Sequence, residues 1–287
     1  MTKPSRLAVA RRNLKLILGN PLGALGFGIV LLLVLVAIFA DFIAPYGYAD
    51  LNVRDRMQGP SPAHLLGTDQ LGRDTFSRAV VGTRVALLVA LPAVGGALFF
   101  GMLLGMTAAL GARWLDNAIM LFLDTIRSFP TVMFALAVVA LVGPSLATVV
   151  AVVMITSVPV YGRVARTQTL ALVNSEFILA ERTMQASFLR ILFVHMLPNI
   201  FGVLAILAAL DIPAVIALEA GLSFLGLGVK PPTPSWGVLL RDGYALIRST
   251  PWLVVAGVIP VILATLGFTF FGEALRDVLD PKLRGRG

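Results

Sequence analysis

Long stretches without a charged residue constrain the fold of this chain more than any other feature. One stretch of 25 residues lies between Lys15 and Asp41, another covers residues 85–112, and a third of 24 residues lies between Arg248 and Glu273. A membrane-crossing α-helix needs about 20 apolar residues, whereas a barrel strand needs only about ten. A helix also satisfies its own backbone hydrogen bonds in lipid. The chain is therefore predicted to be an all-α integral membrane protein.

The composition agrees with this class and excludes others. Hydrophobic residues make up 58% of the 287 residues and charged residues only 13%, against about 25% charged residues in soluble domains. The formal charge of +8 does not indicate nucleic acid as a partner, because most basic residues adjoin predicted spans, where membrane orientation and anionic lipid account for them. With no cysteine and only His64 and His195 as histidines, no metal site is expected.

The apolar stretches predict six transmembrane helices. The short turn signal Gly143-Pro144-Ser145 separates the third from the fourth. The predicted spans are about 21–43, 85–112, 117–142, 146–161, 199–222 and 252–271.

Six spans place both termini on one side of the membrane, and the basic residues indicate which side. The side that carries the termini and residues 162–198 has 14 Lys and Arg residues, and the side with loops 44–84 and 223–250 has eight. The richer side is expected to be cytoplasmic. The first apolar run exceeds the 7–15 residues of a signal-peptide core, so an uncleaved first span is favoured.

The segment from Asn174 to Asn199, NSEFILAERTMQASFLRILFVHMLPN, is predicted to be an amphipathic helix between two spans. Asn174 or Ser175 is a suitable N-cap. Glu181, Arg182 and Gln185 fall on its polar side. We interpret it as a cytoplasmic helix that contacts a soluble partner, with a simple interfacial linker as the alternative. Its apolar face, read at spacings of three and four residues, consists of Phe177, Ala180, Met184, Phe188 and Ile191.

Motifs for catalysis are missing from the sequence. It contains no G-x-x-x-x-G-K-[ST] phosphate loop, no H-E-x-x-H and no G-x-S-x-G nucleophile elbow. We therefore expect no catalytic residues, no metal and no cofactor on this chain, and no ATP hydrolysis by it.

Four charged residues well inside the predicted spans need an explanation, because a carboxylate in lipid costs roughly 2.5–3.5 kcal/mol. Asp211 and Glu219 either line or gate a translocation path, or make structural hydrogen bonds to neighbouring helices. Asp124 and Arg127 are spaced i, i+3, and we expect them to form a structural pair with each other.

Residues 64–74, HLLGTDQLGRD, form a polar loop between the first two spans. Thr68 or Asp69 can cap a short helix there. The two carboxylates and the arginine favour an ion-paired loop over a metal or substrate site.

Four segments, in order along the chain, resemble one family of membrane proteins. They are HLLGTDQLGRDTFSR, EFILAERTMQASFLRILFVHMLPN, LEAGLSFLGLGVKPPTPSWG and ALRDVLDPKLRG. Together they resemble the permease subunits of bacterial ABC importers of the dipeptide/oligopeptide/nickel family, in particular the second permease of the pair, the DppC/OppC type. The resemblance implies the type I importer fold in the bacterial inner membrane, with both termini cytoplasmic. It also implies an N-terminal module at residues 1–80 (first span and periplasmic loop) followed by a transmembrane core at 81–287.

The resemblance further implies partners and a function. The chain would pair with a homologous second permease, with two cytoplasmic ATPases that bind ATP and Mg²⁺, and with a periplasmic binding protein that delivers peptides. Import of a nickel chelate or of glutathione by the same machinery is an alternative. An ion-coupled secondary transporter, with Asp211 and Glu219 as ion sites, is the alternative from a different class.

In that family the motif E-A-A-x-x-x-G forms a coupling helix that is seated in the ATPase. Its acidic position falls on Leu179, its two alanines on Ala180 and Glu181, and its glycine on Gln185, so of these four only Ala180 matches. Replacement of the glycine is expected to stiffen the bend. The resemblance implies that Phe177, Ala180 and Met184 bury against the ATPase. Glu181 and Arg182 would then lie at the rim of the contact.

Overall fold

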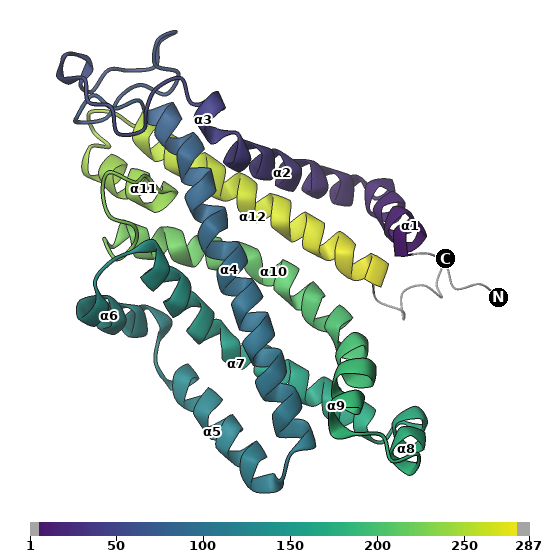
Figure 1. The fold of residues 1–287 in the computed structure, drawn as a ribbon. Helices are drawn as coiled ribbons and strands as arrows, with labels where there is room; N and C mark the ends of the chain where they lie inside the picture. The colour runs from purple at the N-terminus through teal and green to yellow at the C-terminus, as the bar shows by residue number, and fades with distance from the viewer. Residues whose placement is uncertain (1–5, 280–287) are drawn as a thin grey trace.

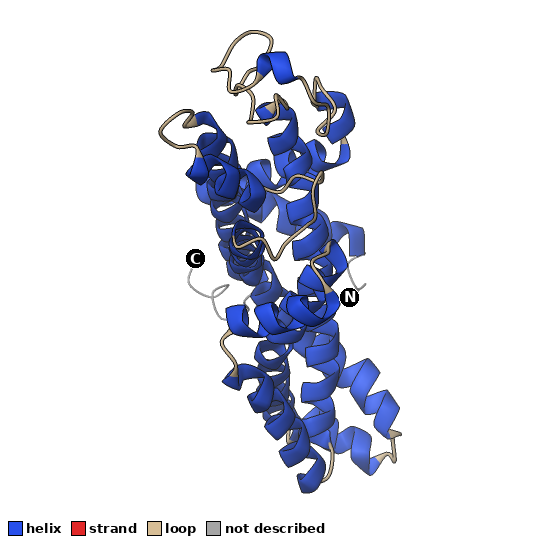
Figure 2. Cartoon of the chain, turned by 90° about the vertical axis from the view of Figure 1, so that its left-hand side faces the viewer, coloured by secondary structure: helices blue, strands red, loops and turns tan. Residues whose placement is uncertain are grey.

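The structure, a computed structural model, describes residues 6–279, including all of their side chains except those of residues 6–10, Arg182 and Leu279. The described part is helical and has no strand, only an isolated bridge between Thr68 and Asp74 (Figure 2). The α-helices are α1 (Arg6–Gly19), α2 (Pro21–Ile38), α3 (Ala40–Ile43), α4 (Thr75–Leu110), α5 (Arg113–Ser128), α6 (Thr131–Val142), α7 (Leu146–Val173), α8 (Glu176–Thr183), α9 (Phe188–Arg190), α10 (Leu197–Phe224), α11 (Trp236–Ala245) and α12 (Trp252–Leu279). A 3₁₀ turn, η1 (Val53–Asp55), and a π-helical turn, η2 (Ile191–Met196), complete the order.

Five helical segments are long and apolar enough to cross a membrane. They are α2, α4, α7, the stretch Phe188–Phe224 that ends with α10, and α12. The prediction of one continuous third span over residues 117–142 was wrong. This part of the chain consists of α5 and α6, which meet at an angle of 88°, the geometry of a broken span or of a re-entrant segment.

Pro130 causes this break. Phe129, directly before it, is extended, with φ −92° and ψ 130°, as expected for a residue whose helical conformation would clash with the proline ring. Pro130 has no N–H to continue the helical hydrogen-bond pattern. The chain therefore changes direction at this dipeptide and resumes as α6 at Thr131.

Two helices continue well beyond the lipid. Helix α4 has 36 residues, a length of about 54 Å against a hydrocarbon core of about 30 Å. Helix α7 continues to Val173, although the fourth span was predicted to end near Tyr161. Hydropathy predicts the point at which a helix leaves the lipid. It does not predict the end of the helix, and both helices continue past that point.

The helices place the polar connections at two ends of the bundle. Figure 1 shows loop 44–74 and α11 at one end, and α1 and α8 at the other. Helix α2 lies along α12 and also contacts α4. The predicted boundary between an N-terminal module and a core, at residues 80/81, falls within the first turns of α4.

Small residues hold the centre of the bundle together where α4 packs on α7. Gly101 and Gly105 are spaced four residues apart on α4 and face Gly162 of α7. A Cβ atom at Gly105 would lie 2.2 Å from the carbonyl oxygen of Gly162, and one at Gly101 would lie 2.5 Å from Cβ of Tyr161. This small-xxx-small pattern lets two membrane helices approach closely, so that dispersion contacts hold them together.

Buried charges hold loop 44–74 in place. Arg73 Nε donates a hydrogen bond to Asp69 Oδ2 over 2.6 Å, and Arg78 Nε lies 3.7 Å from the same oxygen. Asp69 is fully buried, and Arg78 is 1% exposed. The prediction of an ion-paired loop is confirmed.

The cap predicted for this loop is at a different residue. Asp74, rather than Thr68 or Asp69, caps a helix, because its Oδ2 accepts a 2.7 Å hydrogen bond from the backbone N–H of Ser77 at the start of α4. Its other oxygen lies 2.9 Å from His64 Nδ1. The loop is thus attached directly to the first turn of α4. Among the described residues, no group of three or more metal-ligating side chains comes together here or elsewhere.

Candidate functional site

The amphipathic segment after α7 begins where the sequence predicts. Helix α8 starts at Glu176, directly after Ser175. The backbone carbonyl of Ser175 accepts hydrogen bonds from the N–H groups of Ile178 and Leu179, while its hydroxyl donates back to the carbonyl of Leu172 over 2.6 Å. Ile178 is fully buried. This one side chain anchors α8 against the rest of the chain.

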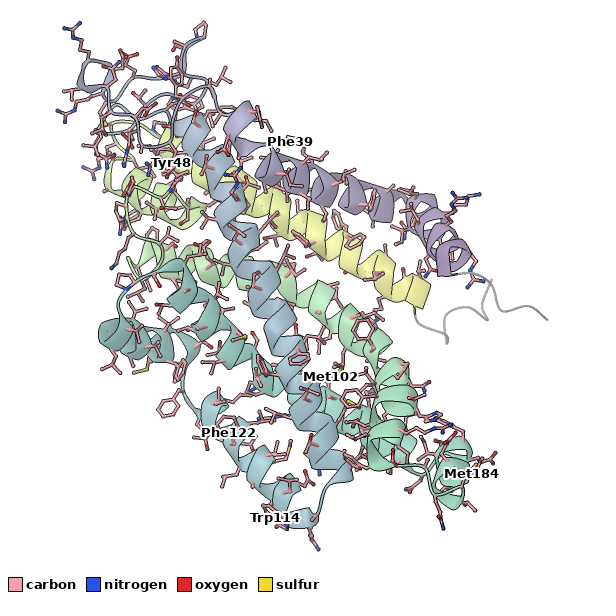
Figure 3. The ribbon with its side chains drawn as sticks, viewed as in Figure 1. Phe39, Tyr48, Met102, Trp114, Phe122 and Met184 are labelled. Atoms are coloured by element: carbon pink, nitrogen blue, oxygen red, sulfur yellow. The ribbon has the colours of Figure 1, made fainter. Side chains whose placement is uncertain are left out.

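The residues predicted to contact a partner are exposed. Phe177 is 42% exposed and Met184 is 77% exposed, and Ala180 between them is exposed as well. Figure 3 shows Met184 at the tip of this segment, away from the other helices. Two apolar side chains of α8 and a third directly after it are thus exposed in the described chain.

The prediction of one uninterrupted helix from Asn174 was wrong, because the chain turns after Thr183. The N–H of Ala186 donates to the carbonyl of Glu181, and Gln185 has a positive φ of 56°. A six-to-one hydrogen bond around a left-handed residue is the Schellman ending of a helix, and glycine is preferred at that left-handed position. The position is the one at which the family motif has glycine. Gln185 therefore adopts the left-handed conformation that this turn requires, although it is not a glycine.

The turn separates residues that the helical pattern had placed on one face. Ser187 accepts a hydrogen bond from the N–H of Arg190 and caps α9. Ile191, Leu192 and Met196 in η2 are buried. Ile191 was predicted to share the exposed face of Phe177, but the reversal of the chain turns it into the core.

Glu181 connects the two halves of this turn. Its Oε1 lies 3.3 Å from His195 Nε2 and its Oε2 lies 3.7 Å from Arg190 Nε. The side chain is 21% exposed, so it faces its own chain more than the solvent. The side chain of Arg182, predicted beside it at the rim, lies outside the described residues.

Asp211 lies in the middle of α10. Tyr161 of α7 donates a hydrogen bond from its hydroxyl to Asp211 Oδ2 over 3.0 Å. The carboxylate is partly buried. Asp211 therefore connects α7 with α10 and still has some accessible surface.

Glu219 is in a different environment, two turns further along α10. It is 1% exposed, and its Oε1 accepts a 2.7 Å hydrogen bond from the hydroxyl of Ser223. The side chain of Ser235, at the start of α11, also interacts with the carboxylate. The structure does not bring Asp211 and Glu219 together. Asp211 is hydrogen-bonded to Tyr161 of α7, and Glu219 is buried beside α11.

The predicted pair of Asp124 with Arg127 was wrong. Asp124 Oδ1 instead lies 2.5 Å from Arg163 on α7, and closer to the start of α5, Asp116 accepts two 2.6 Å hydrogen bonds from Arg166. The side chain of Arg127 makes no hydrogen bond or ion pair with any residue that the structure describes. The charged residues at positions 113, 116, 124 and 127, which lie along one side of α5, are the signal that could have revealed this polar stripe.

Comparisons with known proteins identify what this arrangement belongs to. Residues 98–285 match the family described as "Binding-protein-dependent transport system inner membrane component", and residues 10–60 match the "N-terminal TM domain of oligopeptide transport permease C". The dipeptide transport system permease protein DppC of Alkalihalophilus pseudofirmus is 40% identical over 96% of this chain and 90% of its own length. The glutathione transport system permease protein GsiD of Pectobacterium atrosepticum is 38% identical over 89% of this chain and 85% of its own. The di/tripeptide transport system permease protein DppC of Pseudomonas aeruginosa is 37% identical over 91% and 89%, respectively.

A solved structure has the same fold. A chain of the MetNI methionine ABC transporter, in an inward-facing conformation, superposes with a TM-score of 0.51 at 18% identity and covers 67% of this chain and 94% of its own.

The five or six apolar helices long enough to cross a membrane, together with the family match, define a multi-pass inner-membrane transport protein. The chain belongs to the family of binding-protein-dependent transport system inner membrane components and is an ABC importer permease of the dipeptide/oligopeptide type. This assignment decides between the two classes that the sequence left open, in favour of the importer subunit and against an ion-coupled secondary transporter.

Proposed function

We propose that this permease forms half of the translocation path of a peptide importer. It would pair with a homologous second permease, with two cytoplasmic ATPases that bind ATP and Mg²⁺, and with a periplasmic binding protein. The observation that carries the proposal is the exposed apolar surface of α8 and the turn after it, formed by Phe177 and Ala180 on the helix and Met184 directly after it, while the buried side chain of Ile178 anchors the helix. Apolar side chains presented on a fixed helix are suited to a groove on a soluble partner.

The connection from α8 to the membrane supports a mechanical role. Glu181 links α8 to η2, and η2 continues directly into α10, so that Phe188–Phe224 is one helical segment of 37 residues. A rigid displacement of α8 by an ATPase would therefore move α10, and Asp211 with it. Rigid-body rotation of packed helices is a common form of such switching. Because the chain has no phosphate loop, the energy would come from the ATPases.

The two carboxylates of α10 would have different tasks. Asp211 retains accessible surface and is proposed to line the path, where its hydrogen bond to Tyr161 orients it. Glu219 is enclosed beside α11, so we propose that it gates the path by holding α11 in place. Intramembrane carboxylates usually face a bundle interior or a cavity, which fits both positions.

Peptides are the proposed substrates, because relatives at 37–40% identity are named dipeptide and di/tripeptide permeases. Glutathione is a second candidate, because glutathione permeases are similar to the same extent. Glutathione is itself a peptide, so both candidates place a carboxylate-bearing solute in the path.

The direct test is reconstitution of the chain with its second permease, ATPases and binding protein in proteoliposomes. We expect ATP-dependent uptake of a labelled dipeptide, and no ATP turnover by the isolated permease. Uptake of glutathione but no dipeptide would replace the proposed substrate. ATP hydrolysis by the purified permease alone would contradict the proposal that only the partner ATPases hydrolyse ATP.

A further inference from the structure

An arginine without a partner lies at the break between α5 and α6. Arg127 is 14 residues from the start of α5, about 21 Å along the helix axis. Arg127 lines the same cavity as Thr156 of α7. Thr156 is ten residues, or about 15 Å, from the start of α7 at Leu146. Thr156 and Val160 both lie within the predicted fourth span, residues 146–161, so the cavity that they share with Arg127 is within the membrane.

The side chain of Arg127 is exposed in the isolated chain and has no acidic partner among the described residues. A free cation in hydrocarbon is strongly unfavourable, so an arginine at this depth must face water, a partner subunit or a ligand. The Asp116–Arg166 and Asp124–Arg163 pairs lie on the same side of α5, and their side chains are 20–58% exposed. A charged stripe that continues along α5 to its break indicates a hydrated surface.

A cavity of about 340 Å³ lies at this break. Its size falls in the range of small-ligand sites, roughly 300–1,000 Å³. The walls combine the arginine with two hydroxyl-bearing side chains and the unwound backbone of the break. The lining residues that matter here are Arg127, Phe129, Pro130, Thr131, Thr156 and Val160.

The chemistry of this cavity fits a carboxylate. A planar guanidinium binds a carboxylate through two parallel hydrogen bonds. The hydroxyl of Thr131 makes no hydrogen bond with a described residue and can donate a third. Helix α6 starts in the cavity without a side-chain cap, so its N-terminal dipole favours an anion in the same place.

A neighbouring cavity of about 280 Å³ shares Ile126 with the first one. It is lined entirely by apolar side chains, among them Phe100, Phe122 and Met154. A solute with a carboxylate and an apolar side chain could therefore place the carboxylate beside Arg127 and the apolar side chain in the neighbouring apolar cavity.

We propose that Arg127 and the break between α5 and α6 form a binding site for the carboxylate of the imported solute, within the membrane on the translocation path. The inference rests on the proposed function, because it assigns to that path a position that binds the C-terminal carboxylate of a peptide. The site differs from Asp211 and Glu219, which lie on α10 and carry the opposite charge.

The first experiment measures the charge and water access of the cavity without transport. The chain contains no cysteine, so Thr156→Cys can be introduced alone in the assembled importer in nanodiscs. The measured quantity is the ratio of two labelling rates, that of anionic sulfonatoethyl methanethiosulfonate to that of its cationic trimethylammonioethyl analogue. We expect this ratio to be higher at Thr156→Cys than at Ser249→Cys, which lies in an exposed loop. Adding Arg127→Gln should lower this preference roughly tenfold, whereas Arg127→Lys, which keeps the charge, should retain it. Absence of any reaction in the Thr156→Cys variant, or an unchanged preference after Arg127→Gln, would overturn the proposal.

The second experiment identifies the ligand group. Millimolar alanyl-alanine should protect the introduced thiol of the Thr156→Cys variant from labelling, and alanyl-alanine amide should not. In proteoliposomes, Arg127→Gln should lower the ratio of dipeptide to dipeptide-amide uptake about tenfold relative to the unchanged chain. ATPase activity stimulated by the loaded binding protein should persist, which shows that the complex is intact.

The outcomes separate this site from the proposed function. Equal loss of both substrates together with the ATPase activity would make Arg127 a structural residue of the subunit interface and would refute the site. Protection by alanyl-alanine without any uptake by the unchanged importer would refute peptide as the substrate and leave the carboxylate site standing. Equal protection by peptide and amide would refute the carboxylate as the recognised group.

Discussion

Gln185 shows how a single backbone angle can explain a sequence motif. Its φ of 56° lies in the left-handed region, where an L-residue other than glycine is disfavoured by roughly 1–2 kcal/mol. The neighbouring hydrogen bond from Ala186 to Glu181 fixes this conformation. The glycine of the family motif therefore has a conformational role at the end of α8, and this chain carries a strain there that a glycine would avoid.

We expect Gln185→Gly to stabilise the turn by about 0.5–1 kcal/mol, because relief of the left-handed strain exceeds the extra entropy that glycine gives to the unfolded chain. Slower amide hydrogen exchange of residues 184–187 in the purified permease would check this. Gln185→Ala, which keeps a Cβ, should give no such gain. Faster exchange in the glycine variant would show that the glutamine side chain itself holds the turn.

At the scale of elements, α8 presents an apolar surface while its position is fixed from the inside. Ile178 is fully buried, whereas Phe177 and Met184 are 42% and 77% exposed. The separation of an inner anchor from an outer face allows a partner to contact α8 without displacing it from its own chain. Glu181 belongs to the inner side, since it faces His195 and Arg190.

Ala180→Asp should abolish assembly with the ATPases, because a charge buried in a contact without a partner is unfavourable by several kcal/mol. Co-purification with tagged ATPases measures this. Since Ala180 is exposed in the chain, the variant should still insert and fold. Glu181→Gln, which keeps the shape of the side chain, is expected to co-purify as before, because Glu181 faces Arg190 and His195 of its own chain rather than the partner. Normal assembly of Ala180→Asp would show that α8 is not the coupling element.

A second prediction at this scale concerns the contact between α4 and α7. Gly105→Val should destabilise the permease by roughly 3 kcal/mol or more, because its Cβ would lie 2.2 Å from a backbone oxygen of Gly162 and rigid overpacking costs at least 1–3 kcal/mol. Thermal denaturation in detergent, followed by tryptophan fluorescence, would measure it. Gly95→Val on the same helix is the matched control, because a Cβ there meets nothing within 4 Å. Equal stability of the two variants would mean that α4 and α7 are not packed as described.

At the scale of the whole molecule, the two polar ends of the bundle provide a test of orientation. The basic residues predict that the end with α8 is cytoplasmic and the end with loop 44–74 and α11 is periplasmic. The fold places these groups at opposite ends (Figure 1), as any bundle of spanning helices requires. Which end faces the cytoplasm is a separate question that single-cysteine labelling can answer.

We expect Asn174→Cys to react with an impermeant thiol reagent only in inverted vesicles, and Ser249→Cys only in intact spheroplasts. Both positions are exposed, and neither competes with a native cysteine. Ser235, although it lies in the same loop region, is fully buried and would report burial rather than sidedness. The reverse pattern would overturn the charge-based orientation.

Much of the architecture could be predicted from the chain alone, since a segment such as residues 85–112 has no stable environment except lipid. The start of α8 after Ser175 and the ion-paired loop around Asp69 were also predictable, because capping and charge pairing are local. The sequence did not reveal the break at Phe129–Pro130 as a break within a span. A proline in an apolar run is compatible with a kink as well as with a sharp bend, and only the neighbouring helices decide between them.

The sequence by itself determined the class of protein, most of the spanning helices and the start of the short exposed helix α8, because hydrophobic length and helical periodicity depend on consecutive residues. Only the tertiary structure decided which charges pair. Asp124 has Arg127 one turn away but binds Arg163 of another helix, and Arg127 is left at a cavity. Glu181 was expected to face outward and is held by His195. Each of these outcomes depends on how two helices are packed against each other, and packing joins residues that are far apart in the chain.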